Sequence, residues 1–338
     1  MKRLVTSGWW LGAIVCLTMS TSSAAEWPGG IPLAEPASQR YGFAEALIMG
    51  RDNQGFARPL VSEVGNPDTV FIAEQDLQFP FGGGLRAFLG NRTIDRGGWE
   101  LGYFGLYGQS ASASASTSGT TFLEAAPPLG YTLTDSAQQA TVTWNSVINS
   151  AECNLFRSST ERGETALRTI DWLVGFRYVG VEESARMVLT SCCGAGPLVP
   201  YGVRTRSSMF GGQIGGRGRL DWNRWALEGW AKAALMGSSR EQMQDPLVDW
   251  LGTPVPGRAT ASSATDSVVG FVGDINVSAV YRLNDVWGIR AGYNTIWITG
   301  AALAPDQFSF SAFGAPTSVA GTGGIFLHGA NLGLEARW

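Results

Sequence analysis

The feature that most constrains this chain is a two-residue alternation of apolar and polar side chains. In the closing segment, apolar residues and His328 occupy every second position, and glycine, asparagine and charged residues lie between them. Successive residues of a β-strand point to opposite faces, so this period predicts strands rather than helices. The same alternation marks ten segments: 41–50, 83–92, 97–109, 141–157, 166–182, 203–221, 224–238, 267–282, 286–301 and 325–338.

Charged side chains keep to one face of these segments. The exceptions are Arg157, Arg168, Glu182, Arg204 and Arg206, which lie near segment ends, where a side chain could reach water. Such a distribution needs two environments, one that excludes charge and one that accepts it.

The connections between segments alternate in length. Those after the second, fourth, sixth and eighth segments are short, and the others run to about twenty residues or more, including the Ser/Ala run 110–118 and the Pro/Gly-rich stretch 183–202. This predicts an all-β, transmembrane, antiparallel up-and-down barrel with short periplasmic turns and long extracellular loops. A strand hidden in 51–82 or in another long loop would raise the number from ten to twelve.

A soluble β-sandwich or β-helix also produces a period of two. Charged residues make up only 15% of the chain, against about 25% in soluble domains, and the polar faces are mixed with glycine, which suits a narrow curved interior. These features favour the membrane barrel. The net charge of −4 and the lack of a basic cluster exclude a nucleic-acid partner of the usual kind.

The N-terminus has the layout of a signal peptide. Lys2 and Arg3 precede an apolar stretch, and Ser23, Ala24 and Ala25 offer a cleavage site. We therefore expect a signal peptide at 1–25, a short periplasmic segment at 26–40 and a barrel at 41–338, exported to the outer membrane of a Gram-negative-type envelope.

Three cysteines remain after this cleavage: Cys153, Cys192 and Cys193. The odd number leaves open a vicinal disulfide, a bond from one of the pair to Cys153, or free thiols.

Several stretches resemble a known family. Residues 98–106 (GWELGYFGL), 290–297 (RAGYNTIW), 302–305 (ALAP) and 331–338 (NLGLEARW) are similar to the family called Putative beta barrel porin-7, and the likeness spans nearly the whole mature chain. The resemblance implies an outer-membrane barrel with outer-membrane lipid as its surroundings, and implies little about solute or mechanism. Trp338 resembles the terminal aromatic residue that such barrels present to the barrel assembly machinery.

The polar face predicts the residues that line the lumen. Its acids and bases are equal in number, which argues against ion selectivity and permits ion pairs across the lumen. The lumen-lining residues are Glu45, Arg86, Glu100, Glu152, Asp171, Arg177, Arg217, Arg219, Asp221, Glu228, Lys232, Asp274, Arg282, Arg290, Asn294, Glu335 and Arg337.

No motif for catalysis, a metal or a cofactor stands out, so we expect neither an enzyme nor a cofactor. His328 lies near the long-loop end with Ser309 and Ser311 in the preceding loop, but no orienting group is visible, and an interfacial histidine is the default. Glu182 and Glu183 are expected to form a solvated loop base.

Two functions remain. The sequence favours a narrow, weakly selective, porin-like channel for small hydrophilic solutes. The alternative is a non-conducting structural or surface-interaction barrel with an ion-paired, closed lumen, whose loops meet an unknown extracellular partner.

Overall fold

The computed structural model describes residues 38–54, 58–93, 97–125, 137–163, 166–191, 197–246, 261–308, 318–321 and 323–338. The predicted signal peptide 1–25 and most of the predicted segment 26–40 lie outside the described residues. Those domain boundaries therefore stay predictions.

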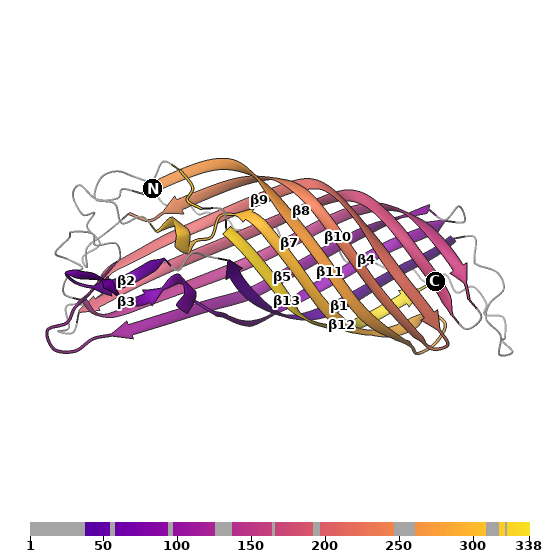
Figure 1. The fold of residues 1–338 in the computed structure, drawn as a ribbon, viewed down its shortest axis with the longest axis horizontal. Helices are drawn as coiled ribbons and strands as arrows, with labels where there is room; N and C mark the ends of the chain where they lie inside the picture. The colour runs from indigo at the N-terminus through magenta and orange to yellow at the C-terminus, as the bar shows by residue number, and fades with distance from the viewer. Residues whose placement is uncertain are drawn as a thin grey trace, which may run out of the picture. The chain divides into compact units, whose positions relative to one another are not determined.

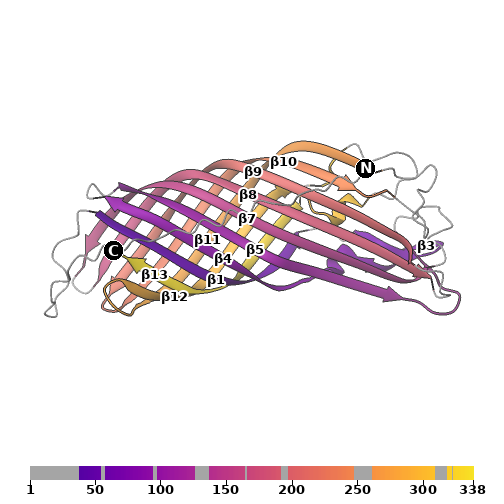
Figure 2. The same cartoon turned by 180° about the vertical axis from the view of Figure 1, so that it is seen from behind.

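Ten strands close into one antiparallel ring, as the alternation predicts (Figure 1; Figure 2 shows the reverse side). Neighbours in the sequence are neighbours in the ring, and the pairing of the first strand with the last closes it. The ring strands are β1 (Ser38–Gln54), β4 (Phe79–Thr93), β5 (Gly97–Ser116), β7 (Ala137–Arg162), β8 (Leu167–Ser191), β9 (Pro197–Trp222), β10 (Trp225–Gln244), β11 (Ser262–Arg282), β12 (Trp287–Ala301) and β13 (Gly323–Arg337).

Three further strands lie outside the ring. β2 (Pro59–Glu63) and β3 (Asn66–Ala73) fall in the stretch suspected of hiding a strand, but they pair with each other, and β2 also pairs with β6 (Leu123–Ala125). The ring therefore keeps ten strands. Two short 3-10 helices complete the described elements, η1 (Glu74–Asp76) and η2 (Pro305–Gln307). No helix in the described ranges is long and apolar enough to cross a membrane.

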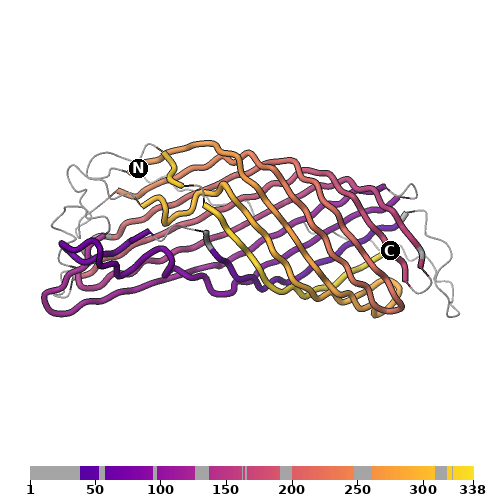
Figure 3. Tube along the Cα trace, in the orientation of Figure 1, coloured from indigo at the N-terminus to yellow at the C-terminus, as the bar shows by residue number. Residues whose placement is uncertain are grey.

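The strand ends that flank the short connections lie at one end of the barrel, together with the C-terminus (Figure 3). The tightest joins β9 to β10 through Asn223 and Arg224, and Asn223 has φ 52°. Two-residue hairpin turns need positive φ, which asparagine tolerates better than most residues. We call this the turn end and the opposite end the loop end.

Two of the predicted long loops were predicted too long, because the neighbouring strands extend into them. β8 and β9 continue to Ser191 and from Pro197, so most of 183–202 is strand, and the Ser/Ala run ends β5 rather than starting a loop. Glu182 and Arg206, taken as residues at segment ends, lie inside these strands and pair across the hairpin at 3.4 Å. The alternation continues there, but the outward positions become polar, because the hairpin extends beyond the region that excludes charge.

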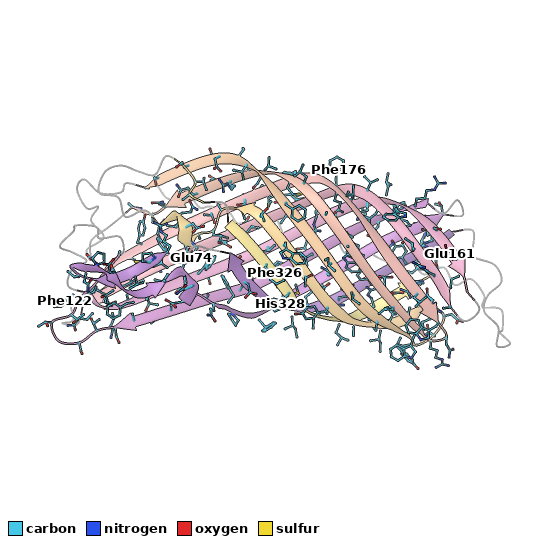
Figure 4. All side chains as sticks on the ribbon, in the orientation of Figure 1. Glu74, Phe122, Glu161, Phe176, Phe326 and His328 are labelled. Carbon is cyan, nitrogen blue, oxygen red and sulfur yellow. The ribbon has the colours of Figure 1, made fainter. Side chains whose placement is uncertain are left out.

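The ring has an apolar outside and an ionic inside. On β10, Leu227 and Leu235 point outward and are exposed, whereas Glu228 and Lys232 between them are buried. Phe176 on β8 is 76% exposed and points away from the ring (Figure 4). This is the reverse of a water-soluble protein, and it fits a closed barrel whose outer wall meets lipid.

A charge placed on that wall tests its environment. We expect Phe176→Arg to lower the free energy of unfolding by about 2–4 kcal/mol in lipid vesicles, because the guanidinium would face acyl chains. Val188→Arg, on the same face of β8 beyond Glu182, is the matched control and should change that free energy by about 0–1 kcal/mol. Denaturant titration in vesicles measures both, and equal losses would contradict a lipid boundary between the two positions.

Candidate functional site

An aromatic layer crosses the barrel interior. Phe43 of β1 and Phe88 of β4 stack with ring centroids 4.9 Å apart, and Trp230 reaches them from β10 at 6.1 and 6.0 Å. β10 lies far around the ring from β1 and β4, so the three rings meet across the interior. Glu100 and Arg217 pack beside this layer around a small void that does not admit a water molecule.

On one side of the layer, Arg290 holds three carboxylates from three strands. Its guanidinium lies 2.8 Å from Glu45, 2.9 Å from Glu228 and 3.0 Å from Glu335. Arg219 bridges Glu228 and Glu335 again, at 3.0 Å each. The guanidinium of Arg290 also lies 4.2 Å from the centre of the Phe43 ring, so this cluster packs directly on the aromatic layer.

A second cluster joins β1, β5, β8 and β9. Arg217 pairs with Asp171 at 2.8 Å and with Glu100, and the Tyr41 hydroxyl donates to Glu100 at 2.8 Å. Glu100 thus receives a charged and a neutral donor, which is what a carboxylate removed from water needs.

A third cluster centres on Asp274 of β11. Arg177 lies 3.1 Å away, Arg86 lies 3.7 Å away, and the Trp230 indole donates to the carboxylate at 3.0 Å. Arg86 also donates to Asn294, whose amide continues the network toward β13. The layer and the ion pairs therefore form one connected polar and aromatic interior.

The structure buries every predicted lumen-lining residue except Arg282 and Arg337. Arg282 is 40% exposed and pairs with Asp221, and Arg337 pairs with Glu335 at 2.7 Å. Trp338 is exposed, and its backbone pairs with Arg40 of β1. Its role in assembly stays a prediction.

The sequence pattern did not predict an ion pair that lies at the loop end. Arg51 lies 2.5 Å from Glu183, both side chains are fully buried, and the Trp144 indole donates to Glu183 at 2.9 Å. The prediction of a solvated loop base is therefore wrong for Glu183. The signal was present, because Glu183 keeps the inward parity of Asp171 and Arg177 on β8, but the predicted strand ended one residue too early.

Loop segments pack against ring residues of the barrel interior beyond this pair. Leu60, Ile72 and Leu77 from β2, β3 and the η1 region join Leu303 and Phe308 from the η2 region in one buried cluster with ring residues. Arg58, which precedes β2, links that part of the chain to the η2 region by donating to the backbone oxygens of Asp306 and Phe308, at 2.6 Å each.

Two carboxyl groups meet within this loop packing, outside the membrane-spanning part of the strands. Burial, together with the neighbouring Asp306 carboxyl, raises the pKa of Glu74 to about 8, and burial raises the pKa of Asp306 as well. Arg58 opposes both shifts, and Glu183 adds to them. Glu74 lies inside the loop-end packing in Figure 4.

The outer wall carries His328 beside two polar side chains. Its Nδ1 is 2.7 Å from the Tyr293 hydroxyl, and its Nε2 is 3.7 Å from Asp52. Ser309 and Ser311, weighed as its partners, lie outside the described residues. Within the ranges that are described, no group of three or more His, Cys, Asp or Glu side chains is placed to hold a metal. Cys153 is a free, exposed thiol, and Cys192 and Cys193 fall among the residues not described.

The profile of the family described as Putative beta barrel porin-7 matches residues 38–338. No match was found among curated proteins. Among solved structures, the outer membrane protease OmpT of Escherichia coli is similar with a TM-score of 0.53 and 11% identity, over 90% of this chain and 97% of that one. This likeness shows the fold.

Two further solved structures give weaker matches. The toluene transporter TodX of Pseudomonas putida has a TM-score of 0.23 and 10% identity, over 90% of this chain and 89% of that one. A FadL homologue of Pseudomonas aeruginosa has a TM-score of 0.24 and 7% identity, over 89% and 90%.

Removing Arg290 should leave the first cluster with an excess of negative charge. Arg290→Met leaves Glu45, Glu228 and Glu335 with less positive charge, and we expect it to lower the free energy of unfolding by about 3–5 kcal/mol, as when one partner of a buried pair is removed. Arg282→Met, at the partly exposed turn end, should cost about 0–1 kcal/mol. Denaturant titration of the two variants in vesicles makes the comparison, and a small loss for Arg290→Met would mean that water enters the cluster.

The carboxyl pair predicts a pH dependence of the loop packing. A raised pKa means that the folded protein binds more protons than the unfolded chain, so the packing is most stable below the ordinary Glu74 value of 4.5 and weakens as the pH rises to about 8. Hydrogen-exchange protection at the Leu77 and Phe308 amides should fall over this range. Glu74→Gln should flatten the decline, and an unchanged profile in that variant would assign the decline to other groups.

Proposed function

We propose that this chain, which belongs to the Putative beta barrel porin-7 family, is an outer-membrane barrel that does not conduct solutes and instead anchors its long strands and loops at the cell surface. The observation that carries the proposal is the Phe43–Phe88–Trp230 layer, which leaves no room for water between itself and the neighbouring Glu100 and Arg217. Barrels of about eight strands are filled by side chains, whereas those of 16–18 leave an aqueous channel. This ten-strand ring behaves like the smaller class.

The charge pattern supports the same function. Selective pores present rings of one sign to the passing ion. Here Arg290, Arg217 and Asp274 each meet partners of opposite sign within the barrel. Charges that are already paired and dry offer a solute neither a binding site nor a path.

The loop end supports the anchoring role. β7 has 26 residues, β8 has 25 and β9 has 26, whereas about 9–11 tilted residues cross the bilayer. The excess places an extended hairpin surface beyond the lipid, with Glu182, Arg186 and Arg206 exposed on it. Export by a signal peptide at 1–25 and placement of this end outside the cell complete the proposal. An unidentified extracellular partner would bind this surface.

The second candidate is the narrow channel for small hydrophilic solutes that the sequence favours. The family description and the polar residues of the interior support this channel. It requires the aromatic layer and the loop packing to move apart, because both obstruct the same interior.

Planar-bilayer recording of the folded chain separates the two candidates. We expect no discrete conductance from the natural chain, whereas the double variant Phe88→Ala with Trp230→Ala, which removes two rings of the layer, should give conductance steps whenever the loop packing opens. Each truncation should also cost about 3–5 kcal/mol of stability, so circular dichroism must first show that the variant remains a barrel.

The matched control removes the same residue types from the outer wall. Phe176→Ala with Trp172→Ala takes away two exposed rings and should leave the bilayer silent. Discrete steps from the natural chain would replace the proposal with the channel.

A further inference from the structure

A trough runs across the outer wall over β8 to β12. Its volume is about 620 Å³, and its lining is formed by Trp172, Ile214, Gly216, Ala231, Phe271 and Trp297 among others. Small residues form the floor and large apolar side chains form the rims. The outer wall of a transmembrane barrel faces hydrocarbon, so acyl chains are the molecules to which this trough is open.

The strand register leads from the trough toward β1. Residues that lie opposite one another on successive strands form a row across the sheet, and two such rows cross the trough. In the row closer to the turn end, Gly216 lies opposite Ala231, and the row continues through Ile275, Thr295 and His328 to Gly50. The next row runs from Ala233 through Gly273, Trp297 and Phe326 to Asp52. Trp297 thus has the trough on one side of it and Phe326 on its other side.

The two rows climb from the turn end toward the loop end. Trp172, at the start of the first row, lies near the turn-end start of β8 and pairs with Gly216, whereas Asp52 lies near the loop-end finish of β1. From Gly216 to His328 the row crosses four strand spacings, which is about 19 Å at about 4.8 Å each. One leaflet of hydrocarbon is about 15 Å thick, so the slanted path matches a single acyl chain that spans its leaflet.

A polar and aromatic cluster stands at the upper end of the path. His328 lies between the Tyr293 hydroxyl and the Asp52 carboxylate, stacks on Phe326 with ring centroids 5.6 Å apart, and meets Phe81 edge-on at 6.1 Å. Figure 4 shows Phe326 and His328 side by side on β13. The Asp52 side chain is 71% exposed, so its carboxylate is accessible from the lipid interface.

We propose that this outer wall binds one lipid with an ammonium headgroup, its acyl chain in the trough and its ammonium at Asp52. The carboxylate supplies the opposite charge for the ammonium. A lipid with the same phosphate but no ammonium lacks this contact and meets the Asp52 carboxylate as a like charge. The proposal requires the barrel to lie in a bilayer, and it does not depend on whether the interior conducts.

The test uses native mass spectrometry of the full folded chain, released from vesicles with equal amounts of phosphatidylethanolamine and phosphatidylglycerol that carry identical acyl chains. We expect the barrel to retain one phosphatidylethanolamine in preference to phosphatidylglycerol. Asp52→Asn should reduce that preference roughly two- to fivefold, the upper range for one exposed ion-pair contact. Asp68→Asn, which changes an exposed carboxylate of β3, is the matched control and should keep the natural preference.

A second pair of variants tests the trough separately. A Cβ at Gly216 would lie 3.7 Å from the nearest atom, and one at Gly218 would meet nothing within 4 Å, so both sites accept a side chain. Gly216→Leu should reduce retention of both lipids alike, whereas Gly218→Leu, beside the trough on the same strand, should not.

Three outcomes would overturn the proposal. Equal retention of the two lipids by the natural chain removes the headgroup site, and so does a preference that survives Asp52→Asn. A dimer in the spectrum that Gly216→Leu dissolves would assign the trough to a second copy of the chain. Silence or conductance in planar bilayers bears on the interior alone, so the two proposals fail independently.

Discussion

The structure depends on one constraint: an ionic side chain can neither face hydrocarbon nor remain alone in a dry interior. Alternation along each strand sends every charged residue of the membrane region inward. Ten strands enclose a narrow interior, and the charges there find partners of opposite sign. Arg290 satisfies this by holding Glu45, Glu228 and Glu335 at once. The apolar wall and the ion-pair network are thus two consequences of the same alternation.

The pairs also fix how the sheet closes. Glu45 and Arg290 are separated by 245 residues, and they meet only when β1 pairs with β13. A slip of one residue in that pairing would turn Glu45 outward to lipid. Gly333, opposite Glu45, fits the closure sterically, because a Cβ there would come 2.0 Å from the Ala44 oxygen. Charge and close approach therefore select the same register.

The sequence predicts the ten ring strands because a single rule, apolar outward and polar inward, holds wherever lipid surrounds the barrel. The rule fails beyond the lipid, because outward positions such as Glu182 are polar there. Both faces of the strand then carry polar residues, and the alternation of apolar and polar side chains is lost. The Arg51–Glu183 pair was missed for that reason. The aromatic layer was missed for another: Phe43, Phe88 and Trp230 are apolar residues on the polar parity, and only the three-dimensional closure of the ring brings them together.

A filled interior changes where such a barrel can bind other molecules. If Phe43 and its partners exclude even water, recognition has to occur on the outer wall or on the strands beyond the lipid. The outer wall is not uniform. It is hollow over the small residues Gly216 and Ala231, and large aromatic side chains project from it on both sides of that hollow. The same glycines that allow neighbouring strands to curve into a narrow ring therefore also shape its surface.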